Sequence, residues 1–198
     1  MSAKRCSAPV FTTSEQFPFL RALEAEWTVI REELLTLGDR EYQVWPETNL
    51  YNQTAGWKTF GLRLFGLRLS ENCARCPRTT ALVEAVPGLL TAGFSRLTPG
   101  TAIKPHRGID LGAFRCHLPL IVPESCGLRV AGETHHWRPG ACVVFDDTQM
   151  HEAWNASSSD RIVLLFDFQK DPRRAHPLAG LLGFLIRLKY RFRVAWRR

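Results

Sequence analysis

Three residues in the second half of the chain have side chains that bind metal ions or carboxylates. His106 lies in the segment His-Arg-Gly, His151 follows 45 residues later, and Arg161 ten residues after that. Neutral imidazole is a common ligand of iron, and a guanidinium pairs bidentately with a carboxylate. We therefore predict that His106 and His151 hold a ferrous ion and that Arg161 binds the far carboxylate of a dicarboxylic cosubstrate. For the histidines alone, the alternative is two partly exposed loop residues.

The sequence lacks a third ligand at the expected place. Ferrous sites with two histidines usually add a carboxylate from a His-x-Asp segment, but Gly108 stands where that aspartate is expected. Asp110 departs from this spacing. Cys73-Ala-Arg-Cys76 has the spacing of half a zinc site, but no second pair follows it, so we favour packing or a local turn there.

The surroundings of Arg161 support a bound anion. Arg161 begins the apolar run 162–166, and a guanidinium at the edge of a buried strand is costly unless it is paired. Asp146 or Asp147 is a candidate partner within the chain, but a bound dicarboxylate is the sharper proposal. Asp147 is also a candidate to orient one of the histidines, since imidazole ligands usually need such a partner.

Alternation along residues 113–122 places two polar side chains together. Because side chains in a strand point to opposite faces in turn, Arg115 and His117 share one face, and the other face carries Cys116, Leu118, Leu120 and Val122. The polar face either turns into a polar cavity or is exposed to solvent. These two readings are equal on the pattern alone.

The remaining pattern predicts a mainly β domain. Apolar residues three or four apart predict an amphipathic helix from Ser14 to about Leu37, and 77–86 reads as a short helix. Trp57 begins an alternating segment that suggests a strand. Further strands are expected at 91–98, 113–122, 127–131, 141–146, 151–155 and 161–168, separated by turns. Short strands with tight turns suggest a small barrel or sandwich such as a jelly roll, within a single domain of residues 1–172.

Composition separates that domain from a basic tail. Residues 173–198 contain eight Lys or Arg and no Asp or Glu, so the total charge of +7 leaves −1 for residues 1–172. The tail reads either as a cationic amphipathic helix at an anionic membrane surface or as a helix packed on the barrel. The six cysteines are irregularly spaced and no export signal precedes them, which predicts reduced thiols and a cytoplasmic location.

Several ordered motifs resemble the catalytic domain of the aspartyl/asparaginyl β-hydroxylases. The resemblance covers residues from about 50 to 170 and includes a segment that resembles the short bacterial members. The matching segments are Ser95-Arg-Leu-Thr-Pro-Gly-Thr, Pro105-His-Arg-Gly108, Arg115-Cys-His-Leu118, Ile121-Val-Pro123, Phe145-Asp-Asp147, His151-Glu-Ala-Trp154 and Arg161, with Glu71-Asn-Cys-Ala-Arg-Cys-Pro77 as the bacterial-type segment. The implied fold is a double-stranded β-helix, also called a jelly roll or cupin-like barrel.

The resemblance implies a dioxygenase that uses Fe(II), 2-oxoglutarate and O₂ to hydroxylate a C–H bond. Its members bind iron through two histidines with glycine in place of the carboxylate, which Gly108 matches. By position, His106 and His151 are then the iron ligands. The implied cosubstrate contacts are Arg161 and Ser95 at the distal carboxylate, Arg115 and His117 at the metal-chelating end, and Trp57 in the pocket wall. Because chloride replaces the carboxylate in iron halogenases, ligand count alone leaves halogenation open.

Three hypotheses follow for what the chain acts on. The first is β-carbon hydroxylation of an aspartyl or asparaginyl residue or a related amino acid. The second is hydroxylation of a membrane lipid acyl chain, of the lipid A or ornithine-lipid type, with 178–198 as a peripheral contact at the inner membrane face. The third is a non-catalytic jelly-roll binding protein, which the intact set of site residues disfavours. Charge alone would permit nucleic-acid binding, but no motif supports it, and none is expected.

Overall fold

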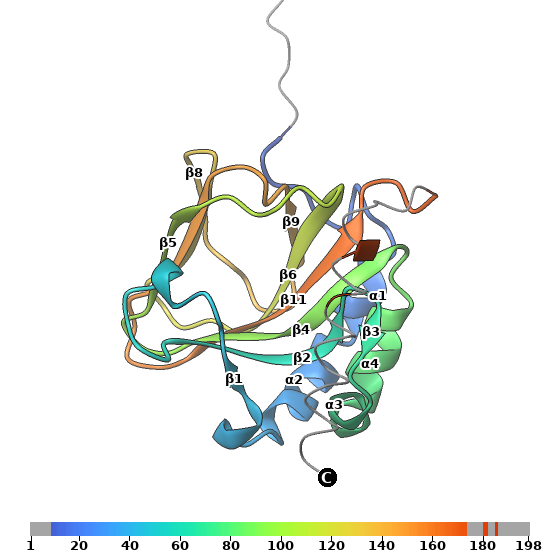
Figure 1. Cartoon of the computed structure of the whole chain (residues 1–198), viewed down its shortest axis with the longest axis horizontal. Coiled ribbons are helices and arrows are strands. Elements are labelled where there is room, and N and C mark those ends of the chain that lie inside the picture. The colour runs from blue at the N-terminus through green and yellow to red at the C-terminus, as the bar shows by residue number, and fades with distance from the viewer. Residues whose placement is uncertain (1–8, 174–179, 182–184, 186–198) are drawn as a thin grey trace, which may run out of the picture.

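Two antiparallel sheets face each other in a double-stranded β-helix (Figure 1). The computed structural model describes residues 9–173, 180, 181 and 185. Within them, the larger sheet has the order β1-β2-β4-β11-β6-β9, with β3 beside β2, and the smaller has the order β5-β10-β7-β8. The strands are β1 Gln43–Val44, β2 Trp57–Leu64, β3 Leu67–Arg68, β4 Leu89–Leu97, β5 Ala102–His106, β6 Ala113–Ile121, β7 Cys126–Val130, β8 Glu133–His135, β9 Val143–Phe145, β10 His151–Asn155 and β11 Arg161–Gln169.

Helices cover the outer face of the larger sheet (Figure 1). They are α1 Leu20–Ala25, α2 Trp27–Leu35, α3 Ser70–Arg75 and α4 Pro77–Glu84, and two 3₁₀ turns, η1 Asp39–Glu41 and η2 Thr48–Leu50, lead into the strands. One core cluster joins Leu20 and Ile30 of the helices to Phe94, Leu118 and Leu164 of the sheet. Burial of these apolar side chains fixes the helices to the sheet.

The inner face of the larger sheet looks toward the smaller sheet. Trp57, Leu97 and Val163 pack there against Leu128 and Ala153 of β7 and β10. Each strand of the larger sheet therefore divides its side chains between a helix-covered apolar face and an inner face.

The alternation predicted for β6 is confirmed, because Cys116 and Leu118 lie in the helix-side core while Arg115 and His117 line a cavity on the inner side. Of the two readings of that polar face, the cavity is the correct one. The predicted strands in the second half are all found within a few residues of their expected ends.

Some elements differ from the prediction. The helix expected from Ser14 to Leu37 is two helices with a break at Glu26, where φ is −102° and ψ is 13°. Trp27, directly after the break, lies against Gly140, whose Cβ would come within 2.7 Å of the indole ring if it were another residue. Strand β5 was not predicted, because it contains Pro105 and only one fully buried side chain, so it lacks an apolar alternation.

The predicted tail helix falls largely outside the described residues. Among the few that are described there, Leu181 and Leu185 are exposed. Within the described parts of the chain, no helix is long and apolar enough to span a membrane. The boundary between a domain at 1–172 and a tail at 173–198 therefore stays a prediction.

Candidate active site

The two predicted metal ligands are direct neighbours in the smaller sheet. His106 ends β5, His151 begins β10, and the two residues are cross-strand partners. Their ring centroids lie 4.2 Å apart. The two histidines meet within one sheet, because β5 and β10 are adjacent strands. Antiparallel pairing at this register places both imidazoles on the same face.

Backbone carbonyls set the orientation of both rings. His106 Nδ1 lies 2.8 Å from the Lys104 carbonyl oxygen, and His151 Nδ1 lies 2.9 Å from the Gln149 carbonyl oxygen. Because a carbonyl can only accept, each Nδ1 carries the proton and each Nε2 keeps its lone pair for a ligand. Burial lowers the pKa of His151 to about 4, which holds this ring neutral. The pair therefore offers two imidazole nitrogens in the form that binds a metal ion.

Asp147 fills the space where a side chain at position 108 would lie. A Cβ on Gly108 would come within 2.3 Å of Asp147 Oδ2, and the Gly108 N–H donates to the Asp147 carbonyl at 2.8 Å. The Asp147 carboxylate also pairs with Arg115 at 3.0 Å, while its burial raises its pKa. The expectation that Asp147 orients a histidine is not met, since backbone carbonyls take that role. Packing against Asp147 thus favours glycine at position 108, in agreement with the motif noted in the sequence.

Arg161 is a buried cation with no ion-pair partner among the described residues. Its residue is 1% exposed, and its Nε and Nη1 have no hydrogen-bond partner among the described residues. Asp146 pairs with Lys170 and Asp147 with Arg115, so neither serves it. Desolvation lowers the Arg161 pKa to about 10, and the guanidinium carbon lies 4.7 Å from the Trp137 ring centroid. An unpaired buried guanidinium is costly, and a bound carboxylate would relieve that cost.

The remaining predicted residues surround the same cavity. Trp57 Nε1 donates to Ser95 Oγ at 3.1 Å, and the Trp57 ring stacks on Trp45 at 4.5 Å between centroids. His117 is buried, and within the described structure neither of its ring nitrogens has a partner. Burial, with Arg161 nearby, lowers its pKa well below the usual range, so this ring is neutral too.

One cavity between the sheets collects all the predicted site residues. Apolar side chains of both sheets complete its wall, including Ile103, Leu128, Phe145 and Leu165. The predicted residues that line it are His106, His151, Arg161, Ser95, Trp57, Arg115 and His117.

Arg115 lies in this cavity but is already engaged. Its Nε donates to Asp167 Oδ1 at 2.8 Å and its Nη2 pairs with Asp147. Thr91 Oγ1 donates to Asp167 Oδ2 at 2.6 Å, completing a row of polar groups across three strands. We did not predict this network. The signal for it was Asp167, which interrupts the apolar strand 162–168 and has the alternation of an inner-face residue.

Other candidates are structural. Cys73 and Cys76 are free thiols buried in the helix-side core, and the described residues contain no cluster of three or more potential metal ligands. Both side chains pack in that core, and the absence of metal at this pair stays a prediction. His136 is exposed and His135 is half-buried, in ring contact with Phe11 at 5.1 Å. His176 lies outside the described residues.

Comparisons with known proteins agree with this geometry. The family model for aspartyl/asparaginyl β-hydroxylase matches residues 24–171. An ornithine lipid ester-linked acyl 2-hydroxylase of Rhizobium tropici is 38% identical over 177 residues, covering 85% of this chain and 63% of that protein. The human aspartyl/asparaginyl β-hydroxylase is 34% identical over 157 residues, covering 75% of this chain and 20% of that protein. The chain thus spans less than two thirds of the length of either relative.

A solved structure supports the fold. The crystal structure of an oxidoreductase of the 2OG-Fe(II) oxygenase family from Burkholderia pseudomallei superposes with a TM-score of 0.51 at 13% identity, covering 86% of this chain and 97% of that one. At this identity the likeness speaks for the double-stranded β-helix alone. The family match spans both sheets and every residue of the cavity described above. The chain belongs to the aspartyl/asparaginyl β-hydroxylase family.

Proposed function

We propose that this protein is an Fe(II)- and 2-oxoglutarate-dependent hydroxylase. The observation that carries the proposal is a single cavity that holds two histidines, each with its Nδ1 against a backbone carbonyl, and one buried arginine with no ion-pair partner among the described residues. Two imidazoles suit ferrous iron, and an isolated guanidinium suits a carboxylate that arrives with a cosubstrate. The relatives with hydroxylase names support the same class of reaction.

His106 and His151 would hold the iron through Nε2. When bound, iron and 2-oxoglutarate together supply the oxidising power for inserting an oxygen atom from O₂ into a C–H bond. Arg161 would fix the distal carboxylate, with Ser95 beside it. Their buried surroundings exclude water and strengthen that pairing. Neutral His117 is available to hydrogen-bond the cosubstrate as well, because both its ring nitrogens are unpaired within the described structure.

Asp147 bears on the halogenation alternative. The place beside Gly108 where a third ligand would lie is not open, because the Asp147 carboxylate occupies that space. A chloride ion at that position would lie against a carboxylate, and like charges repel in a buried site. This observation favours hydroxylation over halogenation.

The relatives' names leave two substrate classes. The Rhizobium tropici protein is named for an ester-linked acyl chain of ornithine lipid, and the human protein for aspartyl and asparaginyl residues. We propose that this chain hydroxylates a C–H bond of a substrate from one of these two classes. The shape and charge of the path by which substrate reaches the site indicate which class it is.

The cosubstrate part of the proposal is tested without knowing the substrate. Anaerobically reconstituted protein is exposed to 2-oxoglutarate and O₂ without an added substrate, and succinate is measured. We expect iron-dependent succinate formation that is abolished in His106→Ala and in His151→Ala. Retained turnover in either variant would refute the metal assignment. Calorimetric titration of 2-oxoglutarate into Arg161→Met tests the anion site separately.

A further inference from the structure

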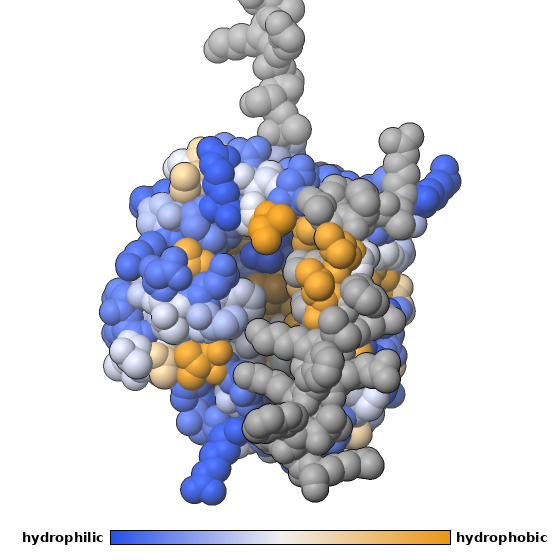
Figure 2. All heavy atoms as spheres, viewed as in Figure 1, coloured by the Kyte–Doolittle hydropathy of each residue, from blue (hydrophilic) through white to orange (hydrophobic). Residues whose placement is uncertain are grey.

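A groove on the inner face of the larger sheet opens from the site cavity. The two share Trp57, Ser95, Arg115 and Leu165 as walls. The groove has a volume of about 140 Å³, compared with about 30 Å³ for the site cavity. A molecule lying in it would therefore end beside the histidine pair. The face drawn in Figure 2 is hollowed near its centre, with hydrophobic residues along part of the rim.

Sheet register explains why the groove is open. Gly61 of β2 pairs with Gly93 of β4, Gly93 pairs with Leu165 of β11, and Leu165 pairs with His117 of β6. These four residues form one row on the inner face, so two positions of the row carry no side chain. A Cβ at Gly93 would lie 2.6 Å from the Phe60 carbonyl oxygen, which keeps that position bare. The row is a shallow trough that leads to His117 in the site cavity.

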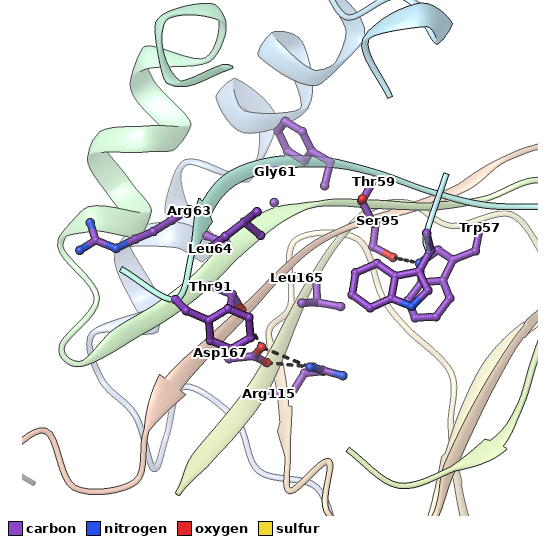
Figure 3. A pocket seen from close by; sticks show the side chains of 15 residues that line it. Trp57, Thr59, Gly61, Arg63, Leu64, Thr91, Ser95, Arg115, Leu165 and Asp167 are labelled. Carbon is purple, nitrogen blue, oxygen red and sulfur yellow. Dashed lines mark hydrogen bonds and ion pairs between the residues drawn. The ribbon is translucent and has the colours of Figure 1, made fainter. Parts of the chain in front are cut away.

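The arginines around this trough are already paired with carboxylates. The Arg63 guanidinium points away from the cavity in Figure 3 and pairs with Glu84 at 3.8 Å. Arg115 is held by Asp167 and Asp147, as the dashed lines to Asp167 show in Figure 3. No unpaired cation therefore lines the described part of the groove. A substrate carboxylate, such as that of an aspartyl residue, would find no partner there and would lose its hydration.

We propose that this groove binds an unbranched acyl chain and that its bare glycine row selects for it. A slender chain fits a trough without side chains, and its burial is favourable at each methylene. Trp57, Trp45 and Leu165 provide apolar walls, and Thr59 flanks the trough next to Ser95 (Figure 3). The inference rests on the proposed function, because it makes the chain the group presented to the iron site.

The test measures binding in the metal-free protein, so it does not depend on turnover. Bromine quenches tryptophan fluorescence at contact, and Trp45 and Trp57 both line the groove. The probe is 12-bromododecanoate, with N-acetylaspartate amide as competitor. Thr59→Phe narrows the trough without adding a tryptophan, and Thr59→Val is the matched control of similar shape. Thermal melts verify that both variants fold.

We expect saturable quenching in the wild type and in Thr59→Val, at least tenfold weaker affinity in Thr59→Phe, and no competition by the aspartyl compound. Affinity should rise about fourfold per added methylene in a series of shorter bromo-acids, as about 0.8 kcal/mol per buried methylene implies. Unsaturable quenching, equal affinity in Thr59→Phe, or no dependence on chain length would overturn the proposal.

Two arms identify the source of the chain. One uses the free bromo-acid and the other uses vesicles of a phospholipid with the same brominated chain. Saturable quenching in either arm supports the groove, and the arm that saturates at lower concentration names the source. Succinate formation by the wild-type protein reports separately on the proposed function. If the protein binds the acyl chain but forms no succinate, the proposed reaction is refuted while the proposed acyl-chain groove is supported.

Discussion

The sharpest prediction concerns Gly108, which stands where related sites carry a carboxylate ligand. In Gly108→Ala, the new methyl group would meet Asp147 Oδ2 at 2.3 Å and Cγ at 2.6 Å. Asp147 cannot easily withdraw, because its carboxylate pairs with Arg115 and its carbonyl accepts from the Gly108 N–H. The backbone at Gly108 is not in the left-handed region, so conformation alone would tolerate alanine.

The two opposing effects can be compared. Overpacking in a buried site costs about 1–3 kcal/mol, whereas glycine to alanine at a compatible backbone gains about 0.4–1 kcal/mol from the unfolded state. The net change lies between about 0 and 2.6 kcal/mol, with a central loss of about 1.3 kcal/mol. For a chain of this size, each kcal/mol lowers the melting temperature by about 2–4 °C. We therefore expect Gly108→Ala to melt about 3–5 °C below the wild type.

A double-mutant cycle isolates the cause. Thermal unfolding is measured for the wild type, Gly108→Ala, Asp147→Ala and the double variant, all metal-free. If the clash with the carboxylate is responsible, Gly108→Ala costs much less in the Asp147→Ala background. An unchanged cost there, or a Gly108→Ala protein as stable as the wild type, would refute the reasoning. By the same logic Gly108→Asp does not tighten iron binding, because the added carboxylate must first displace Asp147.

Three further predictions follow from burial and backbone geometry. Arg161→Met should weaken 2-oxoglutarate binding at least about 30-fold, because it removes an ionic contact worth about 2–5 kcal/mol. The same change should raise the melting temperature of the ligand-free protein, because it removes a buried cation that has no partner among the described residues. Calorimetry measures the first effect and thermal melts the second. Gly140→Ala should lower stability by about 1–2 kcal/mol or more, because φ is +79° and Trp27 lies against it; denaturant unfolding measures this, and an unchanged midpoint would contradict it. Replacing Cys73 and Cys76 by serine should leave the metal content per chain unchanged, as elemental analysis would show.

Sequence reasoning predicted the strands best where the pattern of apolar residues was clear. In β6 the alternation of polar and apolar side chains indicates which face is buried, whereas β11 is a nearly continuous apolar run, which is typical of a strand buried on both faces. Strand β5 was not predicted, although it carries one of the two histidines, because Pro105 and several exposed side chains give it no apolar alternation. The helix break at Glu26 is not marked by a glycine or proline, so the helical spacing of apolar residues predicted one continuous helix.

The sequence by itself determined which groups are present. It identified His106, His151 and Arg161, the glycine at 108 and the family motifs, because these depend on residue type and order. Only the tertiary structure decided which groups are paired, since pairing depends on distances between strands remote in the sequence. It assigned Asp147 and Asp167 to Arg115, left Arg161 unpaired, and aligned Gly61 with Gly93 beside the site. A buried charge is satisfied or unsatisfied only by what the fold brings near it.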